Sequence, residues 1–219
     1  MKYTVKRATD IVEQVSDWNT GQWAQANVLE LKNYMGDKPK HFPKTQAKLL
    51  YDDENLFVFF LVEDRYVRAV ADKTHGNVCR DSCVEFFFTP GCDFEKIYFN
   101  LETNCGGTML FRYNDKKNKI EEYIESIDCK DVIFCHSLPK MIVDEIQEPT
   151  TWTLSYKLPF NVISKYSEMT KPQRGIRWKA NFYKCADKTS HPHWLTWALV
   201  DNLTPDFHLP EYFGVLEFE

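Results

Sequence analysis

The chain of 219 residues carries 27 Lys and Arg against 32 Asp and Glu, which gives a net charge of −5. This mild acidity argues against a nucleic-acid-binding protein, because such proteins present a basic surface to the phosphates. The hydrophobic share of 43% and the mean hydropathy of −0.47 are typical of an ordinary globular protein. The longest apolar run, Leu56–Val62, is far too short to span a membrane, so we expect no membrane partner.

The cysteine content and the start of the sequence bear on the cellular compartment. Seven cysteines cannot all pair within one chain, and none is spaced as Cys-x-x-Cys. The first residues after Met1 contain no apolar stretch of the kind found in a secretory signal. We therefore expect a cytoplasmic protein with reduced thiols, unless an export segment precedes this sequence.

Runs of apolar, β-branched and aromatic residues separated by polar turns predict strands in the first half of the chain. The polar residues 52–55 separate two of these runs and predict a hairpin, whose second strand is buried on both faces because it is continuously apolar. The predicted strands cover residues 46–51, 56–62, 83–89, 96–101 and 107–113.

The second half of the chain continues the pattern, with one short helix predicted over 160–166, after Pro159. Residues 18–34 fit either a helix or an irregular wrap. The predicted strands cover residues 132–135, 141–146, 152–158, 176–184, 194–199 and 213–218. About ten or more short strands with one or two short helices predict an all-β protein, an antiparallel, jelly-roll-like β-sandwich. Composition does not change along the chain, so we expect a single domain over 1–219, with 1–43 as a less regular N-terminal wrap.

The sequence contains no G-x-S-x-G elbow, no phosphate-binding glycine loop and no H-E-x-x-H motif. His191 and His193, with Cys185 nearby, have ligand types suited to a transition metal. The acids of 52–54 suit a hard cation in a turn. For both groups we favour ordinary structural roles, and the metal, if any, stays unknown.

Two segments combine polar and aromatic side chains in a way that suits sugar binding. Glu85 interrupts an otherwise apolar strand and points to the face opposite Val84 and Phe86, where its carboxylate needs water, a donor or a ligand. Residues 207–214 form a polar and aromatic loop before the last strand. Aromatic rings stack on the C–H face of a sugar while polar side chains bind its hydroxyls.

At these segments the chain resembles the family 9 carbohydrate-binding modules, in the variant found as nearly free-standing bacterial proteins. The resemblance covers Lys44 to Glu219, and its motifs occur in the expected order. These motifs are Leu49–Val58, Val62–Asp64, Asp81–Phe87, Trp178–Tyr183, Phe207–Pro210 and Phe213–Phe218. The family implies a β-sandwich that holds a sugar, often the reducing end of a chain, between two aromatic rings. It also implies structural calcium, whose ligands do not map securely onto this chain.

The resemblance implies roles for individual residues. Glu85 matches a hydrogen-bonding acid of the family, Asn181 matches a sugar-contacting amide, and Phe207 matches one of two stacking tryptophans. Cys79 stands at the second tryptophan position and cannot stack, and Asn100 replaces an arginine of the family site. Arg80 or His75 is a candidate to form the side of the sugar site that the second tryptophan would otherwise form. The sugar-binding residues expected on this basis are Phe207, His208, Glu85, Asn100, Asn181 and Arg80.

The expected function is therefore non-catalytic binding of a glucan- or xylan-type oligosaccharide, or its reducing end, as an accessory to carbohydrate catabolism and to a separately encoded glycosidase. Two alternatives remain. A DOMON-like, haem-binding electron carrier would use Met109 and one of the six histidines as axial ligands. A glycoside hydrolase would use Glu85 with Asp64 or Asp81.

Overall fold

The computed structural model describes residues 1–91 and 97–219, and within them the chain is mostly β-structure. Two short α-helices are present in this part, α1 (Ser126–Cys129) and α2 (Phe160–Ser164), with three 3-10 turns, η1 (Gly21–Gln25), η2 (Val78–Arg80) and η3 (Pro210–Tyr212). The strands are β1 (Lys2–Arg7), β2 (Leu29–Glu30), β3 (Asn33–Tyr34), β4 (Lys44–Tyr51), β5 (Asn55–Asp64), β6 (Val67–Ala69), β7 (Cys83–Thr89), β8 (Ile97–Asn104), β9 (Met109–Asp115), β10 (Ile120–Tyr123), β11 (Ile133–His136), β12 (Ile142–Ile146), β13 (Thr150–Pro159), β14 (Arg177–Cys185), β15 (Trp194–Thr196) and β16 (Gly214–Phe218).

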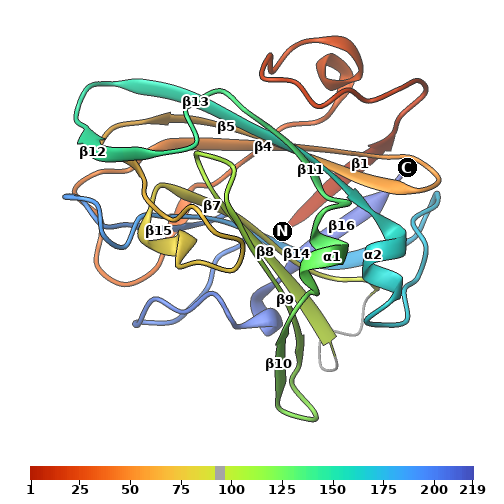
Figure 1. Cartoon of the computed structure of the whole chain (residues 1–219). Coiled ribbons are helices and arrows are strands. Elements are labelled where there is room, and N and C mark those ends of the chain that lie inside the picture. The colour runs from red at the N-terminus through yellow and green to blue at the C-terminus, as the bar shows by residue number, and fades with distance from the viewer. Residues whose placement is uncertain (92–96) are drawn as a thin grey trace.

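These strands form two stacked layers, seen edge-on in Figure 1. One layer has the order β10-β9-β8-β7-β14-β16-β1, and the other has the order β1-β4-β5-β13-β11. Strand β1 belongs to both, because Lys2–Val5 pair with β16 and Lys6 and Arg7 pair with β4. The layers are thus two parts of one curled, 14-stranded sheet, and a separate two-stranded sheet joins β12 to β6.

The predicted β-sandwich with more than ten strands and short helices is confirmed, including the hairpin of β4 and β5. The expected antiparallel pairing holds for the other neighbouring strands of the described residues, whereas β1 is parallel to both β16 and β4. Parallel neighbours need a long connection, and residues 8–43 supply it between β1 and β4. The first 43 residues therefore contain a strand central to the sheet as well as a wrap. Two predictions, the thiol of Cys92 and the strand start at Lys96, fall outside the described residues.

The main hydrophobic core lies between the two layers. Because side chains alternate along a strand, Phe86 and Phe88 of β7 point into this core while Phe87 points to the opposite face. In β5, Val58 and Phe60 enter the same core, and the intervening residues pack against the N-terminal segment through Trp23. The predicted burial of β5 on both faces is thus confirmed. The N-terminal segment that precedes β2 covers the outer face of the layer that contains β5.

The layer that contains β7, β8 and β14 also has a covered outer face. The C-terminal loop that precedes η3 lies over it. Phe87 of β7, Tyr98 of β8 and Tyr183 of β14 form a second cluster there with Phe207 of the loop and with Phe213, which follows η3. This arrangement places the loop residues over the side chains that β7, β8 and β14 present on that face. The candidate site lies between them.

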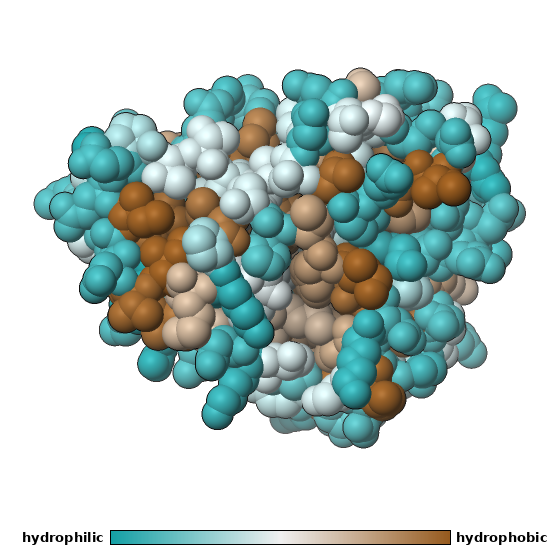
Figure 2. Space-filling model, turned by 45° about the horizontal axis from the view of Figure 1, so that its top comes forward, coloured by the Kyte–Doolittle hydropathy of each residue, from teal (hydrophilic) through white to brown (hydrophobic). Residues whose placement is uncertain are grey.

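The molecular surface has no single dominant apolar area on the face drawn in Figure 2, where hydrophobic patches are separated by hydrophilic side chains. Among the described residues, no helix is both long and apolar enough to cross a membrane.

Candidate functional site

A pocket of about 180 Å³ opens between the outer face of β7, β8 and β14 and the C-terminal loop. Strand alternation sends Glu85 and Phe87 of β7 into it, together with Glu102 of the neighbouring strand β8. Its walls combine carboxyl groups with aromatic rings. The lining residues are Glu85, Phe87, Glu102, Cys185, Asp187, Trp194, Pro205, Asp206, Phe207 and His208.

Two buried carboxyl groups face each other across neighbouring strands in this pocket. Glu85 is directly opposite Glu102 in the β7–β8 pairing, and their residues are 2% and 6% exposed. Burial raises the pKa of Glu85 well above its usual value, and the carboxyl of Glu102 adds to this effect. Burial likewise raises the pKa of Glu102 to about 7. A carboxyl group that keeps its proton near neutral pH can donate a hydrogen bond as well as accept one.

A second layer of amides orients Glu102. Asn100 Nδ2 donates to Glu102 Oε1 at 2.8 Å, and Asn114 Nδ2 donates to Asn100 Oδ1 at 2.7 Å. Asn100 is fully buried and does not line the pocket. Asn100, expected from the sequence to contact the ligand, lies behind the lining of the pocket and holds the Glu102 carboxyl group in place.

The aromatic wall contains both predicted residues of the C-terminal loop. Phe207 stacks on Tyr183 with ring centroids 4.1 Å apart and an interplanar angle of 11°, so one of its faces is already occupied. His208 Nδ1 forms a hydrogen bond with the Tyr98 hydroxyl at 2.9 Å. Burial lowers the pKa of His208 and favours its neutral imidazole.

Trp194 adds an aromatic ring that the sequence did not reveal. It is half-buried, lines the pocket and donates from Nε1 to Asp187 Oδ1 at 2.8 Å. In the β14–β15 pairing Trp194 is opposite Cys185, which places it on the pocket face. An irregular loop joins β14 to β15, so the sequence does not show on which face of the sheet Trp194 lies. Only the pairing of the two strands identifies that face.

Two predicted residues lie outside the pocket. Asn181 is fully buried, and its side chain binds backbone groups: Nδ2 donates to Ala198 O at 3.1 Å, and Oδ1 accepts from Ala198 N at 2.8 Å. Arg80 is exposed in η2 and does not line the pocket, although its charge lowers the pKa of the nearby Asp187, which burial raises overall. The structure thus brings together Glu85, Phe207 and His208, but not these two.

Cys79, which the family resemblance places at the second stacking position, also lies in η2, beside the pocket. Its carbonyl accepts hydrogen bonds from Asp187 N at 3.0 Å and from Cys185 Sγ at 3.5 Å. Burial raises the pKa of its thiol to about 12. Asp187 connects Cys79 to Trp194, because the backbone N–H of Asp187 donates to the Cys79 carbonyl and its Oδ1 accepts from Trp194 Nε1.

The predicted metal-ligand group of His191, His193 and Cys185 is not assembled. His193 Nε2 hydrogen bonds with Lys184 Nζ at 2.8 Å, and His191 stacks on Tyr66. Cys185 instead joins a different potential ligand group with Cys83 and Glu85. Residues 52–54, whose acids suit a hard cation, form an ordinary polar turn. In this turn Asp52 Oδ1 accepts hydrogen bonds from the backbone N–H groups of residues 54 and 55.

The residues named by the two alternative functions have other roles. Met109 packs in the main hydrophobic core. Asp81 Oδ2 accepts from the backbone N–H groups of Val70 and Ala71, and Asp64 pairs with Lys184 on the core side of β14. Neither acid lines the pocket with Glu85.

Comparison with known proteins agrees with this architecture. A protein from Bacteroides uniformis ATCC 8492 that is considered a carbohydrate-binding protein superimposes with a TM-score of 0.88 at 26% identity, covering 100% of this chain and 99% of that one. A family 9 carbohydrate-binding module from Caldicellulosiruptor kristjanssonii shares the fold in two complexes. The glucose complex gives a TM-score of 0.63 at 12% identity and the cellotriose complex 0.62 at 13%; both comparisons cover 100% of this chain, and 96% and 94% of those chains.

Among curated proteins, no sequence matches this chain. A family profile, however, matches residues 10–218, which extends the resemblance well before Lys44 and includes the segment that covers the outer face of β5. The matching profile is that of carbohydrate-binding family 9. The chain therefore belongs to carbohydrate-binding family 9 and is a carbohydrate-binding module.

Proposed function

We propose that the pocket binds one end of a short glucan- or xylan-type oligosaccharide without cleaving it. The observation that carries this proposal is the convergence of Phe207 and Trp194 with Glu85 and Glu102 in one small pocket. Rings provide flat apolar surfaces for the C–H face of a sugar, and carboxyl groups form hydrogen bonds with its hydroxyls. The glucose and cellotriose complexes of the family 9 module from Caldicellulosiruptor kristjanssonii support a glucan-type ligand.

The size of the pocket favours a chain end over an internal segment. A volume of about 180 Å³ is below the roughly 300–1,000 Å³ of pockets that enclose a drug-sized ligand. One terminal sugar ring fits such a space, and the remaining rings extend into solvent. A terminal ring with a few hydrogen bonds gives a modest affinity, in the range of about millimolar to micromolar.

In this proposal Trp194 supplies the second aromatic wall that Cys79 cannot. Phe207 offers one face, because Tyr183 covers the other. Binding without cleavage suits an accessory role in carbohydrate catabolism, in which a separately encoded glycosidase acts on the same glycan.

Isothermal titration calorimetry with glucose, cellotriose and xylotriose tests the proposal. The native protein is compared with Trp194→Leu, with Glu102→Gln, and with Glu168→Gln as a control at an exposed acid outside the pocket. We expect Trp194→Leu to weaken binding about threefold to tenfold, because a ring contact contributes about 0.5–1.5 kcal/mol. Glu102→Gln weakens it and Glu168→Gln does not. Absence of binding to all three sugars, or equal affinity in all four proteins, contradicts the proposal.

A further inference from the structure

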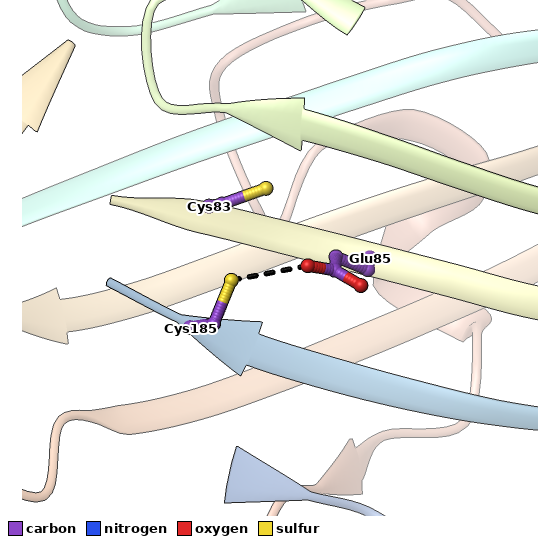
Figure 3. Close-up of side chains that lie close together, drawn as sticks. All are labelled: Cys83, Glu85 and Cys185. Carbon is purple, nitrogen blue, oxygen red and sulfur yellow. Dashed lines mark hydrogen bonds between the residues drawn. The ribbon is translucent and has the colours of Figure 1, made fainter. Parts of the chain in front are cut away.

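Three side chains with soft or anionic ligand atoms converge at the inner end of the pocket. Cys83 and Glu85 are two residues apart on β7, so both point to its outer face. Cys185 on β14 is directly opposite Cys83 in the antiparallel pairing. Figure 3 shows the two sulfur atoms and the carboxyl group together, with Cys185 Sγ 3.0 Å from Glu85 Oε1.

The spacing of these atoms suits a tetrahedral metal ion. The two Sγ atoms and a carboxylate oxygen all lie within 4.8 Å of one another. Tetrahedral zinc, with Zn–S distances of about 2.3 Å and Zn–O distances of about 2.0–2.2 Å, holds neighbouring ligand atoms roughly 3.5–3.8 Å apart. Small side-chain rotations therefore bring these three groups to coordinating positions without moving the strands.

The surroundings favour a cation. Glu102, Asp187 and Asp206 also line the pocket, and among residues 1–91 and 97–219 no Lys or Arg lines it. Lys184 neighbours Cys185 in sequence, but its side chain points to the other face of β14, toward Asp64. A positive charge bound at the thiols would thus be surrounded by carboxyl groups rather than by competing cations.

We propose that Cys83, Cys185 and Glu85 bind one zinc-class divalent metal ion, with its fourth coordination position open to the pocket. Thiolate sulfur selects such soft or borderline metals and disfavours calcium. Glu85 and Cys185 line the pocket, whereas Cys83 lies fully buried behind them, so a water or ligand oxygen reaches the ion from the pocket side. Binding releases the protons of both thiols and of the Glu85 carboxyl group to solvent, because thiolates and carboxylates are the coordinating forms.

Cobalt substitution tests the proposal in the whole protein, without any sugar. The protein is reduced, stripped of metal with a chelator and titrated with Co²⁺, and zinc affinity is measured by competition with a chromophoric chelator. We expect one equivalent of Co²⁺ to produce thiolate-to-cobalt charge-transfer bands and the intense visible bands of a tetrahedral site. Cys83→Ser and Cys185→Ser should each abolish the charge-transfer signature of a two-thiolate site. They should also weaken zinc binding by about 100-fold or more, since even the loss of an outer partner can cost about 10–100-fold.

Cys105→Ser is the matched control, because Cys105 is equally buried but its Sγ donates to Arg68 O at 3.5 Å, away from the group. If the serine variants do not fold, X-ray absorption at the zinc edge of the native protein decides. A zinc ion with two sulfur neighbours and additional oxygen neighbours in this spectrum supports the proposed site. A shell of oxygen or nitrogen alone, or no stoichiometric binding, overturns it. Because sugar is absent, the result is independent of whether the protein binds oligosaccharides.

Discussion

Lys184 Nζ lies 3.4 Å from Asp64 Oδ2, and both side chains are completely shielded from solvent. Since Lys184 belongs to β14 and Asp64 to β5, this ion pair connects the two layers across the interior. Burial alone would raise the pKa of Asp64, but Lys184 and the hydrogen bond with His41 hold it well below its usual range. A buried charge of this kind is tolerated only while its partners remain.

Lys184→Met leaves the carboxylate of Asp64 without its main counter-charge. We expect a loss of about 3–5 kcal/mol in the free energy of unfolding, the usual result of removing one partner of a buried pair. The double variant Lys184→Met/Asp64→Asn removes both charges and should recover much of this loss. Urea denaturation measures all three proteins; a double variant no more stable than Lys184→Met shows that the charge pair is not the cause.

His193 makes stability sensitive to acid. It is 2% exposed, and burial, followed by the charge of Lys184, lowers its pKa to about 3 from the usual 6.5. The folded state therefore keeps His193 neutral where the unfolded chain binds a proton, so its contribution is full above pH 6.5 and is lost as the pH falls toward 3. Between pH 7 and pH 4 the loss amounts to about 3 kcal/mol.

His193→Gln retains a group that can accept from Lys184 but does not titrate. We expect this variant to lose less stability than the native protein between pH 6.5 and pH 4, as measured by urea denaturation at each pH. The depressed pKa of Asp64 adds a separate loss at lower pH that both proteins share. Parallel pH profiles for native protein and variant would contradict the assignment to His193.

Gly106, in the turn between β8 and β9, is required for reasons of space. A Cβ there would lie 2.2 Å from the backbone oxygen of Lys140, which precedes β12 and cannot retreat without moving that strand. Gly106→Ala should therefore destabilise the protein by about 1–3 kcal/mol through overpacking. Gly91→Ala is the control, because among residues 1–91 and 97–219 its Cβ would meet only Thr170, at an ordinary 3.4 Å. Equal thermal midpoints for the two variants would contradict this account.

The sequence predicted strands well because their signal is local. Alternation and apolar runs identified the positions of most strands, and the pattern around Glu85 correctly placed its carboxyl on the face opposite Phe86. The parallel pairing of β1 had no such signal, because its partners lie at residues 44–51 and 214–218. Which strands become neighbours is a property of the assembled sheet.

The same limit applies to the site. Resemblance to the family singled out Glu85, Phe207 and His208, which the fold brings to one pocket. It did not identify Trp194, whose face depends on pairing with β14, or the meeting of Cys83 with Cys185 across about 100 residues of sequence. Asn181 illustrates the converse, since a buried amide must satisfy its hydrogen bonds and here does so with backbone groups.

Phe207 combines a structural and a binding role that two substitutions can separate. Its ring stacks on Tyr183 and fixes the C-terminal loop over β14, and the residue is 9% exposed. Phe207→Ala should lower the free energy of unfolding by about 3 kcal/mol, as is usual for loss of a buried ring. It should also weaken sugar binding, because the loop that carries His208 loses its anchor.

Phe207→Leu keeps most of the apolar volume and removes the flat surface. We expect it to retain more stability than Phe207→Ala in urea denaturation, yet to bind cellotriose about threefold to tenfold more weakly than the native protein in calorimetry. Because the leucine variant still closes the pocket wall, a loss of affinity there reports the ring contact rather than a displaced loop. Native affinity in Phe207→Leu would mean that Phe207 only supports the pocket and that Trp194 provides the stacking surface.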